Sequence, residues 1–203
     1  MTRSIAALAA LSVLWLCGCG GNTVSTTPSE SSASAGAIQQ AYDVPDEAGA
    51  AAYCVKTHGA VEVRHAVYGS NGPSLLFLAG VKTFCQYTSK KDGSRIHILL
   101  STLYTTKPTL AALAYYQKPS MGSCGGNPAS CYCSQLGASD QFGGTYGAGG
   151  GWYKKNSIDQ TLEACIFPDM SSIVSWGLAY HANGIIRGID LSKVMRYKYP
   201  PAR

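Results

Sequence analysis

The sequence predicts an α+β protein built of two tandem helix-strand-strand-strand-helix units, each with a small antiparallel sheet and each stapled by a disulfide. Short stretches with helical and with strand periodicity alternate along the chain. A set of tyrosine and cysteine markers recurs after 79 to 81 positions. The chain also begins like an exported protein and has six cysteines after residue 19, an even number that favours disulfides.

The internal repeat is predicted from three markers. Tyr53-Cys54 recurs as Tyr132-Cys133. The other two are Phe84-Cys85-Gln86-Tyr87, which matches Ala164-Cys165-Ile166-Phe167, and Tyr116-Gln117-Lys118-Pro119, which matches Tyr197-Lys198-Tyr199-Pro200. Chance agreement among common tyrosines and cysteines is the competing explanation. A duplication divides the chain into a signal peptide at 1–18, a disordered tether at 19–37, a first repeat at 38–121 and a second repeat at 122–203.

The first 18 residues have the three parts of an export signal, which are a basic start, an apolar run and small residues at the end. The apolar run of about 12 residues is too short to cross a ~30 Å hydrocarbon core, so cleavage is expected. Leu16-Cys17-Gly18-Cys19 resembles the bacterial lipobox, which implies that Cys19 carries the lipid and becomes the first residue. The alternative is an ordinary signal peptide with two incidental cysteines.

The residues after Cys19 fit a membrane anchor. Acyl chains on Cys19 would hold the protein on a membrane, and residues 20–36 are almost wholly small and polar, as in a flexible tether. Gly20 stands where, by analogy with Gram-negative lipoproteins, an aspartate would favour the inner membrane. For a Gram-negative host we therefore expect a lipid-anchored envelope protein at the outer membrane, facing the periplasm. The net charge of +5 includes no lysine or arginine block, and no nucleic-acid partner is expected.

The first repeat has a local signal for each element. Acidic residues at the start and a glycine at the end predict a helix over 45–59. The next residues alternate, which predicts a strand with Val63 and His65 on its buried face and Glu62 and Arg64 on its outer face. The remaining elements are strands over 75–87 and 96–103, an Asp92-Gly93 hairpin turn between them and a helix that begins at Pro108.

The second repeat is expected to follow the same order. Asn127 caps a helix with Pro128 in its first turn, and that helix stops at Gly137. Asp190 caps the last helix. We expect two helices to cover one face of each small sheet, and the sequence leaves open whether the two sheets join edge to edge.

The cysteines predict three disulfides. Of eight cysteines, Cys17 leaves with the signal and Cys19 takes the lipid, and the other six allow 15 pairings. Because each repeat should close by itself, the predicted pairs are Cys54–Cys85 and Cys133–Cys165, which leaves Cys124–Cys131. Two alternatives remain open, which are partner exchange such as Cys124 with Cys133, and a metal site on Cys131-Tyr132-Cys133. An oxidising compartment and the lack of a spaced histidine pair argue against the metal, so no metal and no cofactor are predicted.

Residues 127–180 resemble a small bacterial domain of unknown function that carries a hemolysin label and occurs in outer-membrane lipoproteins. The motifs are Asn127-Pro128-Ala129-Ser130, Tyr132-Cys133, Gly137, Cys165-Ile166-Phe167-Pro168-Asp169, Trp176 and Leu178. Residues 51–119 form a weaker, degenerate copy. The family pattern has a glycine after the aspartate and two further cysteines around the tryptophan, and this chain lacks all three. The resemblance implies an envelope setting and a helix-to-strand disulfide, and it implies no mechanism.

No catalytic residue is predicted. We expect His65 in the core, His58 at a helix end, His97 toward solvent and His181 in a loop. No Gly-x-Ser-x-Gly is present, and the 11 acidic residues are scattered rather than clustered. These patterns favour a non-enzymatic protein.

One segment has the composition of a binding loop. The glycine-rich stretch 143–151 lacks the Gly-Lys-Ser/Thr that would follow in a phosphate-binding loop, so a long hairpin loop is predicted. Aromatic and cationic residues flank it, which suits stacking on a sugar or contact with an acidic partner. The candidate partner-binding residues are Tyr146, Trp152, Tyr153, Lys154 and Lys155. In the alternative interpretation the aromatics lie back on the sheet.

The sequence therefore predicts a lipid-anchored envelope protein that is structural or binds a partner. The expected partners are the membrane, through the acyl chains on Cys19, and an envelope protein or glycan. The first alternative is an exported inhibitor of a hydrolase such as a protease or lysozyme. The second is an envelope enzyme acting on glycan, which would require His97 or His181 to meet a carboxylate in a pocket.

Overall fold

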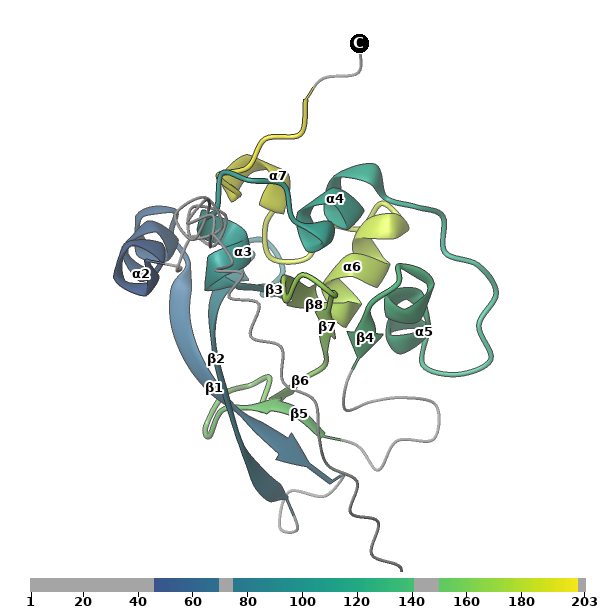
Figure 1. The fold of residues 1–203 in the computed structure, drawn as a ribbon, viewed down its shortest axis with the longest axis horizontal. Helices are drawn as coiled ribbons and strands as arrows, with labels where there is room; N and C mark the ends of the chain where they lie inside the picture. The colour runs from purple at the N-terminus through teal and green to yellow at the C-terminus, as the bar shows by residue number, and fades with distance from the viewer. Residues whose placement is uncertain (1–45, 70–74, 141–149, 201–203) are drawn as a thin grey trace, which may run out of the picture. The chain divides into compact units, whose positions relative to one another are not determined.

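The computed structural model describes residues 46–69, 75–140 and 150–200, which belong to one compact unit (Figure 1). The predicted signal peptide, the tether, Cys19 and Tyr146 lie outside the described residues. Within the described part of the chain, none of the helices is both long and apolar enough to span a bilayer.

Short helices and strands make up the unit. The helices are α2 (Glu47–Lys56), α3 (Leu100–Tyr104), α4 (Leu110–Gln117), α5 (Pro128–Gln135), α6 (Ser175–Ala182) and α7 (Leu191–Val194). The strands are β1 (Ala60–Tyr68), β2 (Leu76–Thr88), β3 (Arg95–Leu99), β4 (Ser139–Asp140), β5 (Gly150–Tyr153), β6 (Thr161–Leu162), β7 (Ala164–Ile166) and β8 (Ser172–Val174). The predicted α+β class with antiparallel strands is confirmed.

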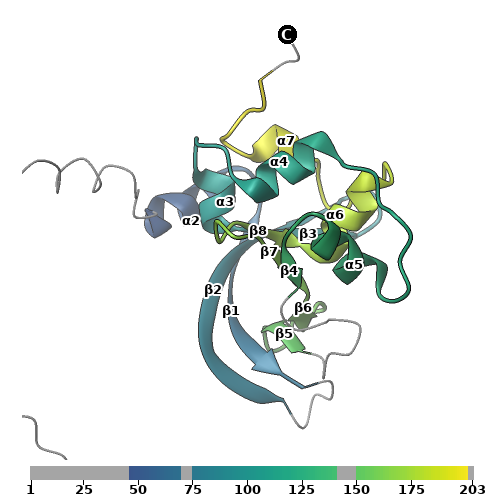
Figure 2. The same ribbon diagram turned by 45° about the vertical axis from the view of Figure 1, so that its right-hand side comes forward.

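All described strands belong to one antiparallel sheet in the order β4-β7-β8-β3-β2-β1-β5-β6. The strands of the two halves of the chain meet where Ile98 of β3 pairs with Ile173 of β8. The sheet curls into a half-barrel, and Figure 2 shows the long hairpin of β1 and β2 bending away from the helices. The helices gather at the opposite end, around β3, β7 and β8 (Figures 1 and 2).

The predicted element order holds for the first half of the chain and changes in the second. The strand predicted over 96–103 ends at Leu99, and its last four residues belong to α3. In the second half, β5 pairs with β1 and β6 pairs with β5, so this part of the chain extends the first half's side of the sheet. The second half of the chain therefore does not form the separate three-stranded unit that the sequence predicts.

Local sequence signals explain the helix ends. The Asn127 side chain accepts hydrogen bonds from the amides of Ala129 and Ser130 at 2.9 and 3.4 Å, which caps α5. Asp190 caps α7 in the same way through the amide of Ser192 at 3.0 Å. The hairpin between β2 and β3 turns at Gly93, whose φ of 70° is accessible to glycine at little cost.

The described cysteines form three disulfides, Cys54–Cys85, Cys124–Cys131 and Cys133–Cys165, which are the pairs expected from the sequence. The first joins α2 to β2, and the third joins α5 to β7. Both pairs are fully buried among core side chains such as Phe84, Ile98 and Ile173. Each of these two disulfides therefore fastens a helix to the sheet across the core.

The structure corrects the predicted buried face of β1. Glu62 and Arg64 are 5% and 0% exposed, whereas Val63 is 52% exposed and His65 is also on the surface. From Glu62 to Ala66 the period of two is correct, but the covered face is the opposite one. An irregularity in the β1–β2 pairing between His65 and Val67 then breaks the alternation, and Val67 is buried as predicted. The curled sheet and the segment after β5 enclose the side that holds Glu62 and Arg64. The two side chains pair with each other, and Glu62 also contacts His97 on β3 and Lys154 in that segment.

Candidate functional site

A buried ionic network lies inside the curl of the sheet, centred on the Glu62 carboxylate. Its Oε2 atom accepts hydrogen bonds from Arg64 Nη2 at 2.6 Å and Nε at 3.0 Å, and it lies 3.2 Å from Nε2 of His97. Its Oε1 atom accepts from Lys154 Nζ at 2.8 Å. Opposite charges two apart on one strand share a face, so β1 itself brings Glu62 and Arg64 together.

The network determines the charge state of its members. Burial alone would raise the pKa of Glu62, but the hydrogen bonds from His97, Lys154 and Arg64 outweigh it and hold that pKa well below its usual range. Burial lowers the pKa of His97, and the hydrogen bond to Glu62 only partly opposes this. Near neutral pH the carboxylate is therefore ionised and the imidazole is neutral, so Nε2 can donate to Glu62 while His97 carries no charge.

Arg64 also fixes the segment that follows β5. Its Nη1 donates to the backbone oxygens of Trp152 at 3.1 Å and Asp159 at 2.8 Å. The same segment is closed by a backbone hydrogen bond from Lys154 to Gln160 at 2.8 Å. A fully buried guanidinium thus holds a surface loop in one conformation, because its fixed donors leave few alternative arrangements.

The held loop presents Asp159 to Arg95 on β3. The two side chains form a bidentate ion pair, in which Arg95 Nη2 donates to Oδ1 of Asp159 at 3.0 Å and Nε donates to Oδ2. The hydrogen bonds from Arg95 hold the pKa of Asp159 below its usual value. Arg95 and Asp159 are both partly exposed, so this pair forms the wall of a surface pocket.

That pocket has a volume of about 320 Å³, at the small end of the ~300–1,000 Å³ typical of ligand sites. Four separated segments line it, namely β3, the chain around β6, the end of β8 with α6, and Arg187. The lining residues are Arg95, His97, Asp159, Thr161, Leu162, Glu163, Val174, Trp176, Gly177, Tyr180 and Arg187. His97 belongs both to this pocket and to the buried network, so the two are in contact through this side chain.

Aromatic side chains form one side of the pocket. Trp176 and Tyr180, one turn apart on α6, have ring centroids 5.8 Å apart, and the Trp176 residue is 38% exposed. The guanidinium of Arg187 lies 4.9 Å from the Tyr180 ring centroid. Glu163 lies next to Trp176. Burial and the nearby Asp140 carboxylate raise the pKa of Glu163, and hydrogen bonds from Asn127, whose Nδ2 donates to Oε2 at 3.1 Å, and from the Trp176 side chain only partly oppose this.

The residues of the predicted binding loop do not form one site in the structure. Trp152 is buried at 4% exposure, so its ring lies back on the sheet, as in the alternative interpretation. Lys154 is committed to Glu62, and Lys155 is exposed. Tyr153 packs edge-on against Phe77, with ring centroids 5.4 Å apart. A second, shallower groove of about 580 Å³ is lined by Val63, His65, Phe77, Tyr153, Lys154 and Lys155.

Three of the four histidine predictions need correction. His97, predicted to face solvent, is 2% exposed because it completes the ionic network. His65, predicted for the core, is on the surface because the covered face of β1 is the other one. His181, predicted for a loop, lies in the last turn of α6 and stacks on Tyr115 with ring centroids 3.7 Å apart. His58 does lie at a helix end, just after the cap of α2.

The Glu62 network predicts a loss of stability in acid. A carboxyl whose pKa is depressed by folding stabilises the protein above its unfolded pKa of ~4.3, and the contribution is lost as the pH falls toward the folded pKa. We therefore expect the urea midpoint of the wild type to fall steeply between about pH 5 and pH 3. Glu62→Gln should flatten this pH dependence, and the remainder should come from Asp92, Asp159 and Asp190, whose pKa values shift in the same direction. An equally steep profile in Glu62→Gln would contradict the assignment.

The arrangement suits recognition of a small polar molecule. It offers fixed donors and acceptors beside an aromatic face, which is the usual composition of a ligand pocket. Among the described residues, no group of three or more His, Cys, Asp or Glu side chains could hold a metal ion.

Comparison with known proteins gives no further information about the site. No family model, no curated protein and no solved structure matched the chain, and the resemblance to the hemolysin-labelled lipoprotein domain stays a prediction.

Proposed function

We propose that this chain is a lipid-anchored protein of the cell envelope, held at the outer membrane by acyl chains on Cys19, and that it binds a small polar ligand without transforming it. The supporting observation is a pocket lined both by the partly exposed Trp176 and by the Arg95–Asp159 ion pair. In this proposal the folded unit is a binding module on the periplasmic side of the membrane.

The pairing of the charged groups favours binding over catalysis. Glu62 is surrounded by four nitrogen atoms from three side chains, and Asp159 accepts hydrogen bonds from Nε and Nη2 of Arg95. A general base needs a pKa near the working pH, whereas the pKa values of both carboxyls are lowered. These groups are therefore suited to fixing the shape of the pocket rather than moving a proton.

We infer that the unit arose by duplication, with two tandem copies now fused into one sheet. The two halves of the strand order mirror each other about the β3–β8 pair. Equivalent rows cross the sheet on the two sides, Val61, Cys85 and Ile98 on one, and Asp140, Cys165 and Ile173 on the other. Leu99 and Val174, which precede α3 and α6, have φ and ψ within about 4° of each other. Strands β5 and β6 are then an insertion in the second copy.

A second candidate is a glycan-acting enzyme at the same pocket. Asp159 and Glu163 both line it, and their pKa values are shifted in opposite directions, down for Asp159 and up for Glu163. Glycosidases use such a pair, one carboxyl as acid and one as carboxylate. An enzyme would shorten an oligosaccharide that a binding module leaves intact, and it would stop doing so in Glu163→Gln.

The proposed anchor is tested by a matched pair of cysteine variants. Metabolic labelling with radioactive palmitate should label the wild type and Cys17→Ser alike, because only Cys19 would survive cleavage to carry the lipid. Cys19→Ser should lose the label and appear in the soluble fraction after cell disruption. Retention of label in Cys19→Ser, or its loss in Cys17→Ser, would contradict attachment at Cys19.

A further inference from the structure

We infer that the ligand of the pocket beside Trp176 is an uncharged sugar ring, stacked on the Trp176 indole and hydrogen-bonded to the polar side chains that line the same pocket. This inference rests on the proposed binding function and names the class of ligand. Three features of the pocket lead to it: its balance of charge, its aromatic wall and its preformed polar groups.

The charges that line the pocket are balanced. Two arginines, Arg95 and Arg187, stand against two acids, Asp159 and Glu163. Arg95 and Asp159 already neutralise each other in a bidentate pair, and Arg187 lies over the Tyr180 ring. An anionic or a cationic ligand would have to break this balance, since each sign of charge meets a group of the same sign nearby. A neutral ligand with many hydroxyls would not.

The aromatic wall is placed by the close approach of α6 to β3. Gly177 makes this possible, because a Cβ atom at that position would lie 2.8 Å from Cγ1 of Ile96. The adjacent Trp176 then stands beside the Arg95 end of β3 with part of its surface free. The flat, apolar face of an indole suits the C–H face of a sugar ring, and Tyr180 extends the wall by one helical turn.

The polar groups are fixed before any ligand arrives. The buried Arg64 guanidinium holds the backbone at Asp159, and Asp159 in turn orients Arg95. Glu163 is held by Asn127 at 3.1 Å. Rigid donors and acceptors bind with less loss of side-chain entropy, so weakly interacting hydroxyl groups can still be recognised. The pocket volume of about 320 Å³ suits about one or two sugar rings.

The test uses the full lipidated protein in detergent and three uncharged trisaccharides, maltotriose, cellotriose and triacetylchitotriose. Iodide quenching reports an accessible indole, and Trp176 is partly exposed whereas Trp152 is buried. At least one trisaccharide should protect the fluorescence from iodide, and the protected component should be missing in Trp176→Phe. By calorimetry, Trp176→Ala should weaken binding about tenfold or more, with Trp176→Phe retaining most of the affinity.

Tyr68→Ala is the matched control, because Tyr68 is an exposed aromatic at the far end of β1 and should leave the affinity unchanged. Unchanged urea midpoints in all variants would show that folding is intact. Preference for the cationic trimer of glucosamine, for trigalacturonate or for a charged tripeptide, lost in Trp176→Ala, would overturn the proposal of an uncharged sugar and leave the proposed binding function intact. Binding by none of these probes, or binding that Trp176→Ala leaves unchanged, would overturn both.

Discussion

Replacing Arg64 with alanine is expected to lower the free energy of unfolding by about 3–5 kcal/mol. Arg64 is 0% exposed and is bonded both to Glu62 and to the backbone oxygens of Trp152 and Asp159. Its removal leaves those buried acceptors with fewer partners and empties the volume of the side chain. The measurement is the urea midpoint at neutral pH, read by circular dichroism.

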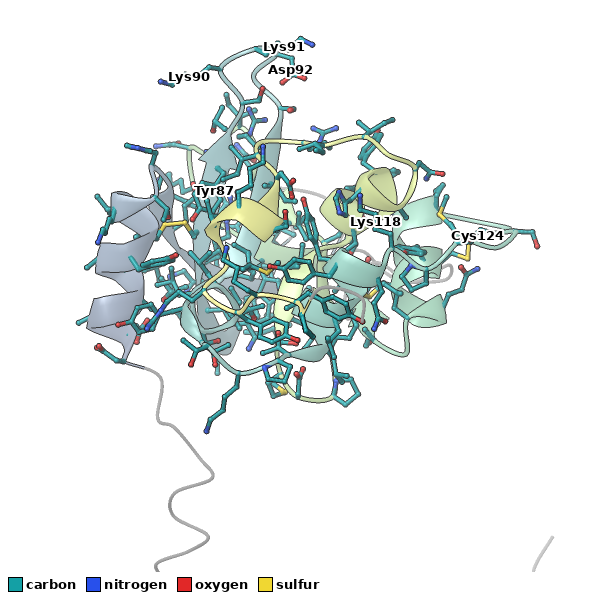
Figure 3. All side chains as sticks on the ribbon, turned by 90° about the horizontal axis from the view of Figure 1, so that it is seen from above. Tyr87, Lys90, Lys91, Asp92, Lys118 and Cys124 are labelled. Carbon is teal, nitrogen blue, oxygen red and sulfur yellow. A yellow bond between two sulfur atoms is a disulfide. The ribbon has the colours of Figure 1, made fainter. Side chains whose placement is uncertain are left out.

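A matched surface variant separates this effect from a general sensitivity to lost charge. Lys91 stands at the tip of the hairpin between β2 and β3, pointing away from the rest of the molecule (Figure 3), and is fully on the surface. Lys91→Ala should change the unfolding free energy by less than about 0.5 kcal/mol. A loss below about 1 kcal/mol for Arg64→Ala would mean that the buried network does not hold the structure together.

The second large effect is expected from the two disulfides that join a helix to the sheet. Loss of Cys54–Cys85, in the double variant Cys54→Ala/Cys85→Ala, should lower the free energy of unfolding by roughly 3–4 kcal/mol, because the bridge closes a loop of 31 positions. Cys133–Cys165 closes 32 positions and should behave alike. The measurement is again urea unfolding of the purified, oxidised protein.

The short disulfide supplies the control for this series. Cys124–Cys131 closes only 7 positions and lies toward the edge of the molecule, where Cys124 is seen in Figure 3. Loop-closure entropy then predicts a loss of roughly 2–2.5 kcal/mol for the matching double variant. An equal or larger loss at this short bridge would show that loop length does not determine how much each of the three disulfides stabilises the protein.

Much of the secondary structure could be predicted because its signals are local. The Asn127 cap with Pro128 behind it, the Asp190 cap and the Asp92-Gly93 turn each depend on a few neighbouring residues. The disulfide pairs could be proposed from spacing alone, because the repeated tyrosine-cysteine markers limited the choice.

The buried face of β1 could not be predicted from its alternation. A period of two fixes which residues share a face, but the covering of that face depends on where distant segments pack. Here the segment after β5 returns to β1 across some 90 positions and encloses Glu62 and Arg64. The apolar residues of the strand favoured burial of the face with Val63. The only signal for the other face was the pair of opposite charges, Glu62 and Arg64, two positions apart.

The pocket lacks any local motif. Arg95, Asp159, Trp176 and Arg187 come from four separated parts of the chain, and only the curled sheet brings them together. The aromatic and cationic residues around 150–155 predicted a binding site in the neighbouring loop instead. One of them, Trp152, proved to be part of the core, and another, Lys154, part of the network beneath the pocket.

The most direct test of the proposed binding function is the crystal structure of the protein with the trisaccharide that protects the indole best. We expect one sugar ring to lie face to face with Trp176, with hydroxyl groups in hydrogen-bonding distance of Arg95, Asp159 or Glu163. The trisaccharide bound elsewhere, such as in the groove beside Phe77 and Tyr153, or an empty pocket at saturating ligand, would contradict it.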